Sequence, residues 1–396
     1  GATGAMPSLR ARVRWCAVAA AASLAGALAG VAVSVSIGVS VAENIITNDV
    51  SAFIKNADTR VIARTGEIRV EATENAAIES DAVAASVSVA IGVIGVALSG
   101  AGADATNIVS NSVTSYIVDS AVATEVPQDY LSSQQIDVLE QGKRVLLVQD
   151  STGANGYRGT AGQVYEYIGA TTGSATDPVG LAGERYLDAT QWKLISVGSK
   201  DIVIDALNTS SINSVVGAVA VSASGGLIAA AGSVGVTLSD NVIGSIEQEA
   251  FNPDTLAFET LTFQNQAMSW IENSVVDSAQ DLVVTASSEE TIDSEGYAGS
   301  AAIAIGVGAA LAGAGVEVNN VFDTVTYAWI DQSDVTAGGD LTVQATSDSE
   351  LLSSSANGVA ISVSLGSLSI AASLVDTEIT NDVRAWISGD SDDSMY

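Results

Sequence analysis

The sequence repeats, and the repeat limits which folds are open to it. An aromatic residue followed by isoleucine ends an alternating run five times along the 396 residues. The segments 46–54 and 379–387 are identical at seven of nine positions. Self-similarity of this kind is typical of chains whose units stack on one another. The five pairs are Phe53-Ile54, Tyr116-Ile117, Trp270-Ile271, Trp329-Ile330 and Trp386-Ile387.

A second anchor is an acidic residue that opens a strand-like alternation, at Glu67, Asp201, Asp281 and Asp340. Three of these follow shortly after an aromatic anchor, whereas Asp201 follows Tyr116 only after a long interval. The interval from Asp201 to the next aromatic anchor is also longer than the intervals that follow the other three acidic anchors. The unit is therefore about 59 residues long, and inserts of about 74 and about 20 residues interrupt the repetition. We predict repeats over 1–124 and 199–396, a small inserted β module over 125–198, and a short insert at about 250–267.

Within a unit the apolar residues alternate with a period of two, which favours β-strands. Residues 68–72 are apolar at even positions and residues 87–93 at odd positions, and we interpret this change as a turn or bulge. Glycines at 92, 225–226 and 306 are the expected corners. We predict an all-β β-solenoid with two or three strand-rich turns in each unit; stacked antiparallel β-sandwich repeats are the alternative.

Every unit contains a long run without charge, and a transmembrane helix needs such a run of about 20 residues. Serine at alternate positions and many β-branched residues favour strands instead. Residues 201–396 hold one basic residue, Arg384, so no positive-inside signal orients a helical bundle. We therefore expect no membrane-spanning segment. The uncharged runs are 15–42, 82–103, 206–239, 296–316 and 351–375.

The amino-terminal segment has two interpretations. Arg10, Arg12 and Arg14 precede an apolar stretch, as in a secretory signal. The run 25–42 also fits the alternation of later units, and we favour retained first strands. The single cysteine, Cys16, excludes an internal disulfide, and we expect it to be a small buried residue.

The composition limits the chemistry. The chain has 14 Lys and Arg against 46 Asp and Glu, a net charge of −32, and no histidine. A surface this acidic repels phosphate, so we exclude nucleic-acid binding. Histidine triads and histidine-ligated zinc are excluded as well, and we expect no catalytic function. The enzyme alternative is a polysaccharide-cleaving β-helix that uses Asp277, Asp281 and Asp331.

Calcium is the cofactor that the acidic residues allow, because Ca²⁺ accepts carboxylate and carbonyl oxygens. The candidate ligands are Asp340, after two glycines, and Asp390 and Asp392 near the end of the sequence. The simpler interpretation of Asp340 is a solvated acid after a glycine turn, and that of Asp390 and Asp392 is a solvated tail. The full Gly-Gly-x-Gly-x-Asp repeat of calcium β-rolls is absent from the sequence.

Asparagines recur in register, and stacked amides form hydrogen-bonded ladders along a solenoid. We expect a structural role for them. The residues are Asn44 and Asn48, Asn107 and Asn111 with the same spacing one unit later, and Asn319 and Asn381 in corresponding strands.

The inserted module differs in composition, since with nearby Lys200 it holds six of the 14 basic residues. Its aromatic residues either form the core of the module or stay exposed and stack on the sugar rings of a glycan. We expect the core. The aromatics are Tyr130, Tyr157, Tyr165, Tyr167, Tyr186 and Trp192.

The repeats resemble those of giant secreted bacterial surface proteins of the adhesin or filamentous-haemagglutinin type. The resemblance rests on residues 87–117 and 303–343, with Thr-Ala-Gly-Gly-Asp-Leu-Thr-Val at 336–343, and on 164–169 and 191–194 of the insert. It implies a right-handed parallel β-helix, export to the cell surface, and a role in adhesion, matrix or filaments. We expect end-to-end self-association or a longer parent chain.

Overall fold

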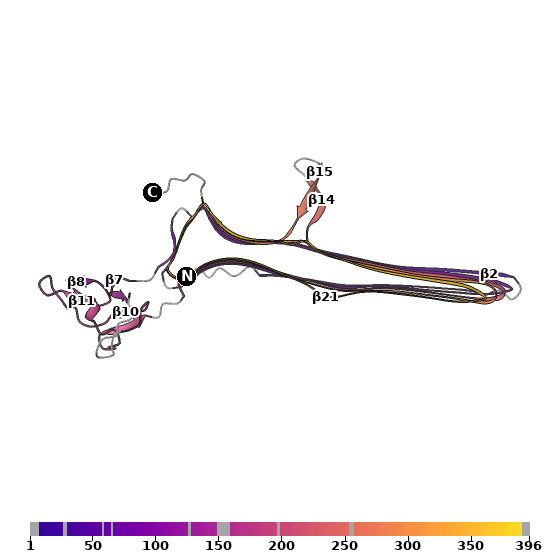
Figure 1. Ribbon diagram of the computed structural model, residues 1–396, viewed down its shortest axis with the longest axis horizontal. Coiled ribbons are helices and arrows are strands. Elements are labelled where there is room, and N and C mark those ends of the chain that lie inside the picture. The colour runs from indigo at the N-terminus through magenta and orange to yellow at the C-terminus, as the bar shows by residue number, and fades with distance from the viewer. Residues whose placement is uncertain are drawn as a thin grey trace.

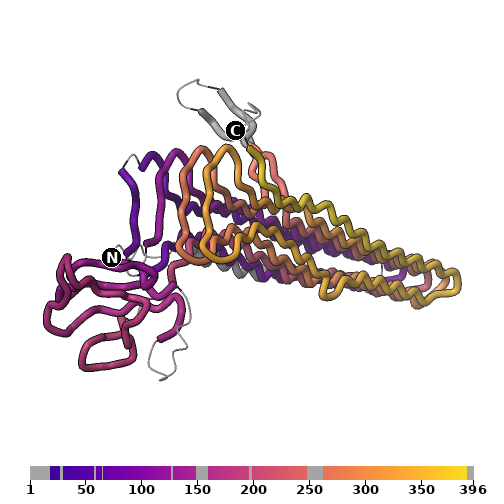
Figure 2. The backbone as a smooth tube through the Cα atoms, turned by 60° about the vertical axis from the view of Figure 1, so that its left-hand side comes forward, coloured from indigo at the N-terminus to yellow at the C-terminus, as the bar shows by residue number. Residues whose placement is uncertain are grey.

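The computed structural model describes residues 8–26, 30–57, 59–64, 66–125, 128–148, 159–195, 199–252 and 257–389. Its long strands wind into five stacked coils (Figures 1 and 2). Each coil has an outgoing and a return stretch, and the first four coils also have a short closing strand. The prediction of two or three turns in each unit is wrong, because strands such as β4 (Ile68–Ile91) and β5 (Ile94–Val118) use a whole unit for one coil.

The coils follow one another along the chain with the same order of strands. The first contains β1 (Ser8–Gly26), β2 (Val31–Lys55) and β3 (Val61–Ala63), and the second contains β4, β5 and β6 (Ala121–Thr124). The third contains β13 (Ile202–Ile243), β16 (Asn265–Glu272) and β17 (Val275–Ser278). The fourth contains β18 (Leu282–Phe322), β19 (Thr324–Asp331) and β20 (Asp334–Ala337), and the last β21 (Leu341–Val363), β22 (Gly366–Ile379) and β23 (Asp382–Ser388).

Neighbouring coils pair in parallel and in register. β13 runs parallel to β4 and β5 on one side and to β18 on the other, with Ile202 opposite Ile68 and Leu282. The all-β parallel solenoid is thereby confirmed, and the antiparallel sandwich is wrong. Among the described residues, antiparallel pairing is confined to the two inserts.

The two inserts project from the stack as separate sheets. One is the hairpin of β14 (Ile246–Asn252) and β15 (Ala257–Phe263), which stands on the return side of the third coil (Figure 1). The other carries two small sheets, ordered β12-β10-β9-β7 and β11-β8. Its elements are β7 (Tyr130–Leu131), β8 (Gln135–Ile136), β9 (Arg144–Leu146), β10 (Val164–Tyr167), β11 (Val179–Gly180), the 3₁₀ turn Leu181–Gly183 and β12 (Trp192–Ile195).

Together the coils form a long flat blade, and the outgoing strands turn back at its tip (Figure 1). The turns lie at the expected glycines, between β4 and β5 at Gly92 and within β13 at Gly225–Gly226. Gly306 has φ +140°, and a Cβ there would collide with the carbonyl oxygen of Gly226 in the coil below. The stacked tips therefore require glycine at this position.

The inner face of the blade changes from large to small side chains toward the tip. In β4, Val70 and Ile78 point inward near the base, whereas alanine and serine fill the inner positions of 82–90. The turn predicted between 68–72 and 87–93 is wrong, because β4 is continuous and its large apolar residues move to the outer face. The two sheets approach so closely there that a Cβ on Gly38 would lie 2.5 Å from the carbonyl oxygen of Ala85.

In the part of the chain that the structure describes, no helix is long and apolar enough to cross a membrane. Where the structure describes them, the uncharged runs lie in the long strands of the blade and the turns at its tip. Ser8–Gly26, the segment that includes Cys16, forms β1 of the first coil and pairs with β4.

Candidate functional site in the axial ladders and coil edges

Five aromatic rings stack in one column along the solenoid, which confirms their predicted equivalence. The ring centroids are 5.1, 4.3, 4.8 and 5.1 Å apart from Phe53 through Tyr116, Trp270 and Trp329 to Trp386. Adjacent rings are within 15° of parallel. The column lies on the outside, with Phe53 55% and Trp386 37% exposed.

The stacking decides what this aromatic column can bind. Sugar rings pack on the faces of aromatic side chains, and the faces within the column are covered by the neighbouring rings. Water therefore meets mainly ring edges. Only Phe53 and Trp386, at the two ends of the column, have a face without a ring from another described coil.

A buried asparagine ladder also follows the axis. Asn44 donates through Nδ2 to Oδ1 of Asn107 at 2.8 Å, and Asn107 donates in the same way to Asn241 at 2.9 Å. Asn241 continues to Asn320 at 3.1 Å. The predicted ladder is confirmed for Asn44 and Asn107. The prediction for Asn319 is wrong, since its neighbour Asn320 occupies the inner position and Asn319 bonds to the carboxylate of Asp240.

A second column joins backbone N–H groups to amide oxygens of the next coil, and Thr324 takes the place of asparagine in the fourth coil. The N–H of Asn48 donates to Oδ1 of Asn111 at 3.1 Å, and the N–H of Asn111 donates to Oδ1 of Asn265 at 3.1 Å. At the far end the N–H of Thr324 donates to Oδ1 of Asn381 at 3.2 Å. Both columns run in one direction, so each coil presents amide oxygens to the coil before it.

The directional ladders leave an open acceptor at the first coil. Oδ1 of Asn44 is buried and has no hydrogen-bond partner among the described residues. In the last coil Thr377 lies at the ladder position, opposite Asn320. A hydroxyl can donate, so one end of the stack carries a free acceptor and the other a donor.

The strand edges are open at the same two ends. Among the described strands, β1 pairs only with β4 and β2 only with β5. β21 and β22 pair only with β18, and β23 only with β19. Each end therefore presents long rows of unpaired backbone groups to another parallel strand.

No known protein family matches this chain, and no curated protein or solved structure does either. What the chain can do therefore follows from its own side chains and strand edges.

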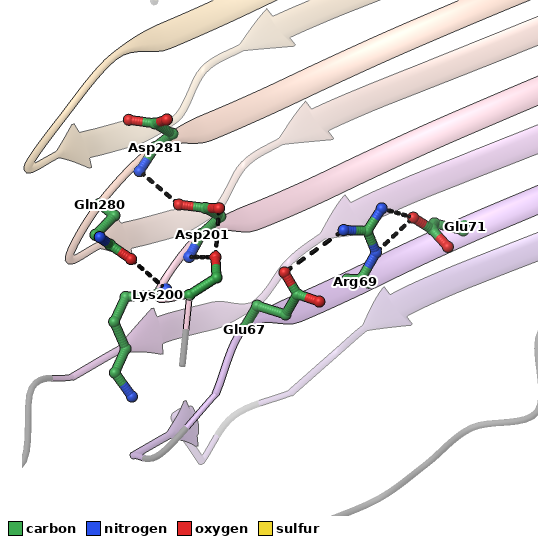
Figure 3. A network of polar contacts seen from close by, with 8 residues as sticks. Glu67, Arg69, Glu71, Lys200, Asp201, Gln280 and Asp281 are labelled. Carbon is green, nitrogen blue, oxygen red and sulfur yellow. Dashed lines mark hydrogen bonds and ion pairs between the residues drawn. The ribbon is translucent and has the colours of Figure 1, made fainter. Parts of the chain in front are cut away.

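The acidic anchors form a third column at the start of the outgoing strands (Figure 3). The N–H of Asp281 donates to Oδ1 of Asp201 at 3.1 Å, and the N–H of Asp340 donates to Oδ1 of Asp281 at 2.8 Å. These carboxylates thus bind the backbone of the following coil. Asp340 belongs to this column, and Asp390 and Asp392 lie outside the described residues. Within the described ranges, no three His, Cys, Asp or Glu side chains gather to hold a metal.

Near this column Arg69 and Lys200 have contrasting surroundings (Figure 3). Arg69 donates from Nε to Glu71 at 2.6 Å and pairs with Glu67 at 3.5 Å, and the bond to Glu71 raises the pKa of the guanidinium. The Lys200 side chain is buried and its Nζ has no partner among the described residues. Burial lowers the pKa of Lys200. In the sequence Lys200 stands out only as a basic residue near the insert.

Two glutamates lie inside the solenoid and were missed from the sequence. Glu290 is 1% exposed and accepts hydrogen bonds from Ser349 at 2.7 Å and Asn265 at 3.4 Å. Glu74 accepts one from Asn48 at 2.9 Å. Burial raises the pKa of both carboxyls. Both glutamates have even residue numbers, as do the inward-facing residues of β4 and β18. This parity could have predicted from the sequence that their side chains face the interior.

The three aspartates of the enzyme alternative have separate partners. Asp277 forms an ion pair with Arg60 at 3.0 Å. Asp281 belongs to the acidic column, and Asp331 accepts a hydrogen bond from Ser388 at 2.7 Å. Each carboxylate has a structural role in joining coils or corners.

The module's aromatic residues pack on one another. The rings of Tyr186 and Trp192 have centroids 4.6 Å apart, and those of Tyr167 and Trp192 are 5.0 Å apart. Tyr165, Tyr167, Tyr186 and Trp192 are at most 5% exposed, so they form the core that we expected. Burial raises the Tyr186 pKa well above its ordinary value. Tyr130 packs against this core, and Tyr157 lies outside the described residues.

Proposed function

We propose that the chain is an extracellular structural or adhesive repeat protein of the bacterial cell surface that forms fibre segments by stacking end to end. The observation that carries the proposal is the directional asparagine ladder, whose acceptor end at Oδ1 of Asn44 is open. A further coil at either end extends the ladders and covers the strand edges. The resemblance of the repeats to secreted adhesins supports the location and the adhesive role.

The two ends match each other chemically. If the last coil of one copy stacks on the first coil of another, Thr377 lies beside Asn44 and supplies a donor to its open Oδ1. In the same arrangement Trp386 stacks on Phe53 and the aromatic column continues. The segments 46–54 and 379–387, identical at seven of nine positions, place these groups in equivalent positions.

We test the proposal with charges at the two ends of the aromatic column. The variant Phe53→Asp/Trp386→Asp sets two carboxylates against each other at every junction, where like charges directly opposite are destabilising. The control is Val275→Asp, since Val275 is 51% exposed on the middle coil. The unsubstituted chain and the control should form concentration-dependent filaments in sedimentation and electron microscopy, and the end variant should remain short.

Filaments of unchanged length from the end variant would contradict the proposal. So would an unsubstituted chain that stays monomeric at every concentration.

A further inference from the structure

The outer face of the return sheet is apolar in the half of the blade nearest the tip. Ile37, Val234 and Ile370 point outward there and are 68, 53 and 63% exposed. A groove of about 600 Å³ crosses this face, and none of the described residues that line it is charged. In a chain with a net charge of −32, so large an uncharged face marks an interaction surface.

Two adjacent columns of this face hold large and small residues in opposite order. In the second, third and fourth coils one column contains Leu98, Gly232 and Leu311. Two residues further from the tip, the next column contains Gly100, Val234 and Gly313. In these three coils a projection in one column lies beside a hollow in the other. In the first and last coils both columns hold large residues, Val35 with Ile37 and Leu368 with Ile370. We call these six residues the paired columns.

We infer that this face packs against the same face of a second copy of the chain. A half-turn about the stacking direction, centred between the paired columns, sets each column of one copy against the other column of the second copy. In the three middle coils Val234 of each copy then lies over Gly232 of the other, Leu98 over Gly100, and Leu311 over Gly313. In the outer two coils large residues face each other, Val35 over Ile37 and Leu368 over Ile370. A contact of this kind is isologous, because the same patch serves on both sides.

The size of the face fits a stable pair. Five strands about 4.8 Å apart and a stretch the length of Val31–Val41, at about 3.3 Å per residue, give about 800 Å² on each copy. The pair would bury about 1,600 Å², the area of a standard specific interface. The charged positions Asp104 and Glu317 lie at the margin of this area, in register with Val41 and Leu238.

The arrangement also leaves room for the rest of the molecule. The half-turn places the tip residue Leu227 of one copy over Ser239 of the other. The hairpin on the same side begins later, at Ile246, and stays clear of the tip. The strand edges at the ends of the coil stack remain open, so lateral pairing and end-to-end stacking are compatible.

A lipid surface is the competing occupant of an apolar face. Among the described strands, β2 and β22 each leave one edge unpaired. Unpaired backbone groups in hydrocarbon cost several kcal/mol each, whereas a pair in water leaves these edges solvated. The matched residues of the three middle coils add a shape requirement that lipid chains do not have. Both observations favour a second copy.

The first experiment exchanges a projection and a hollow. Gly100→Leu fills one hollow, and a Cβ at this position meets no atom within 4 Å, so the fold has room for it. We expect it to weaken pairing at least tenfold in sedimentation velocity, although it adds apolar surface. Leu98→Gly/Gly100→Leu has the composition of the original chain and restores the match, so pairing should recover. Gly217→Leu, on the outgoing sheet, is the control.

Equal or tighter association of Gly100→Leu, or no recovery in the exchanged variant, would overturn the proposal.

The second experiment leaves the paired columns unchanged. A spin label at Leu227→Cys, in a Cys16→Ser background, reports distances between tips. The lateral pair predicts about 40 Å, whereas end-to-end stacking of five coils predicts about 24 Å. We expect the longer distance. The shorter distance alone overturns the lateral pair and leaves the fibre proposal standing. Flotation with phosphatidylcholine vesicles, without the longer distance, assigns the face to lipid and overturns the pair.

Discussion

Many residues buried inside this solenoid are polar, and the hydrogen-bonded ladders explain how the fold tolerates them. A buried amide or hydroxyl costs free energy unless it is hydrogen-bonded. The asparagines meet this demand by bonding to their own equivalents one coil away. A buried carboxylate is harder to satisfy, because burial disfavours its charged form. Glu290 is therefore the clearest place to measure what the interior requires.

We predict that Glu290→Gln stabilises the protein at neutral pH by about 1 kcal/mol. Burial, with a smaller contribution from Asp348, raises the pKa of Glu290 in the folded chain above its ordinary 4.5. The folded state thus binds a proton that the unfolded state has released, so stability falls as the pH rises from 4.5 through the raised pKa. Glutamine removes this loss, and the difference from the original chain should shrink in acid.

Denaturant unfolding at several pH values measures the effect. Glu289→Gln, at the adjacent outward position, is the control and should change little. A loss of stability in Glu290→Gln at pH 7 would show that the charged form is favoured inside.

At the scale of the strands, the column of stacked aromatic rings connects all five coils. An inner ring has a neighbour on each face, and an end ring has one. Because stacked aromatic pairs contribute about 0.5–1.5 kcal/mol beyond the area they bury, position in the column should set the cost of truncation. The partial exposure of the rings keeps this cost below that of a fully buried aromatic.

We predict that Trp329→Ala costs about 2–3 kcal/mol and Trp386→Ala about half as much. Trp329 loses two stacked neighbours, whereas Trp386 loses Trp329 and an edge contact with Tyr327. Chemical denaturation measures the totals, and hydrogen exchange locates the loosened coils. Equal costs at the two positions would mean that the stacking itself contributes little.

The strands also show what could be predicted from sequence. The anchors determined the register, because residues at a constant spacing must stack when each unit makes one coil. The number of turns in a unit was wrong, since ordinary strands are near five or six residues long and these exceed 20. The change of parity in β4 was mistaken for a turn, because the sequence alone does not reveal that the sheets approach closely enough to admit only small inner side chains. The paired columns could not be predicted for the same reason, because the sequence alone does not show which apolar residues face outward near the tip.

At the scale of the whole molecule, charge and stacking oppose each other. The interior and the apolar face hold few charges, so most of the −32 lies on the remaining outer surface. Acids on adjacent coils already affect one another, since burial and then the charge of Asp240 raise the pKa of Asp104. At each junction of a fibre, the register would set Asp376 of one copy beside Glu43 of the next. Repulsion between exposed charges is screened over about 8–10 Å at physiological ionic strength.

We therefore predict that salt promotes end-to-end assembly. Diffuse screening acts alike for all cations at equal ionic strength, whereas a bound Ca²⁺ would need carboxylates such as Asp340, whose column ends at the last coil. Light scattering in NaCl, MgCl₂ and CaCl₂ at matched ionic strength separates these mechanisms. Coinciding curves mean that screening acts alone, and a shift in calcium alone that is lost in Asp340→Asn identifies a specific site. Filaments that dissociate as salt rises would show that attraction between charges, and not repulsion, governs the junction.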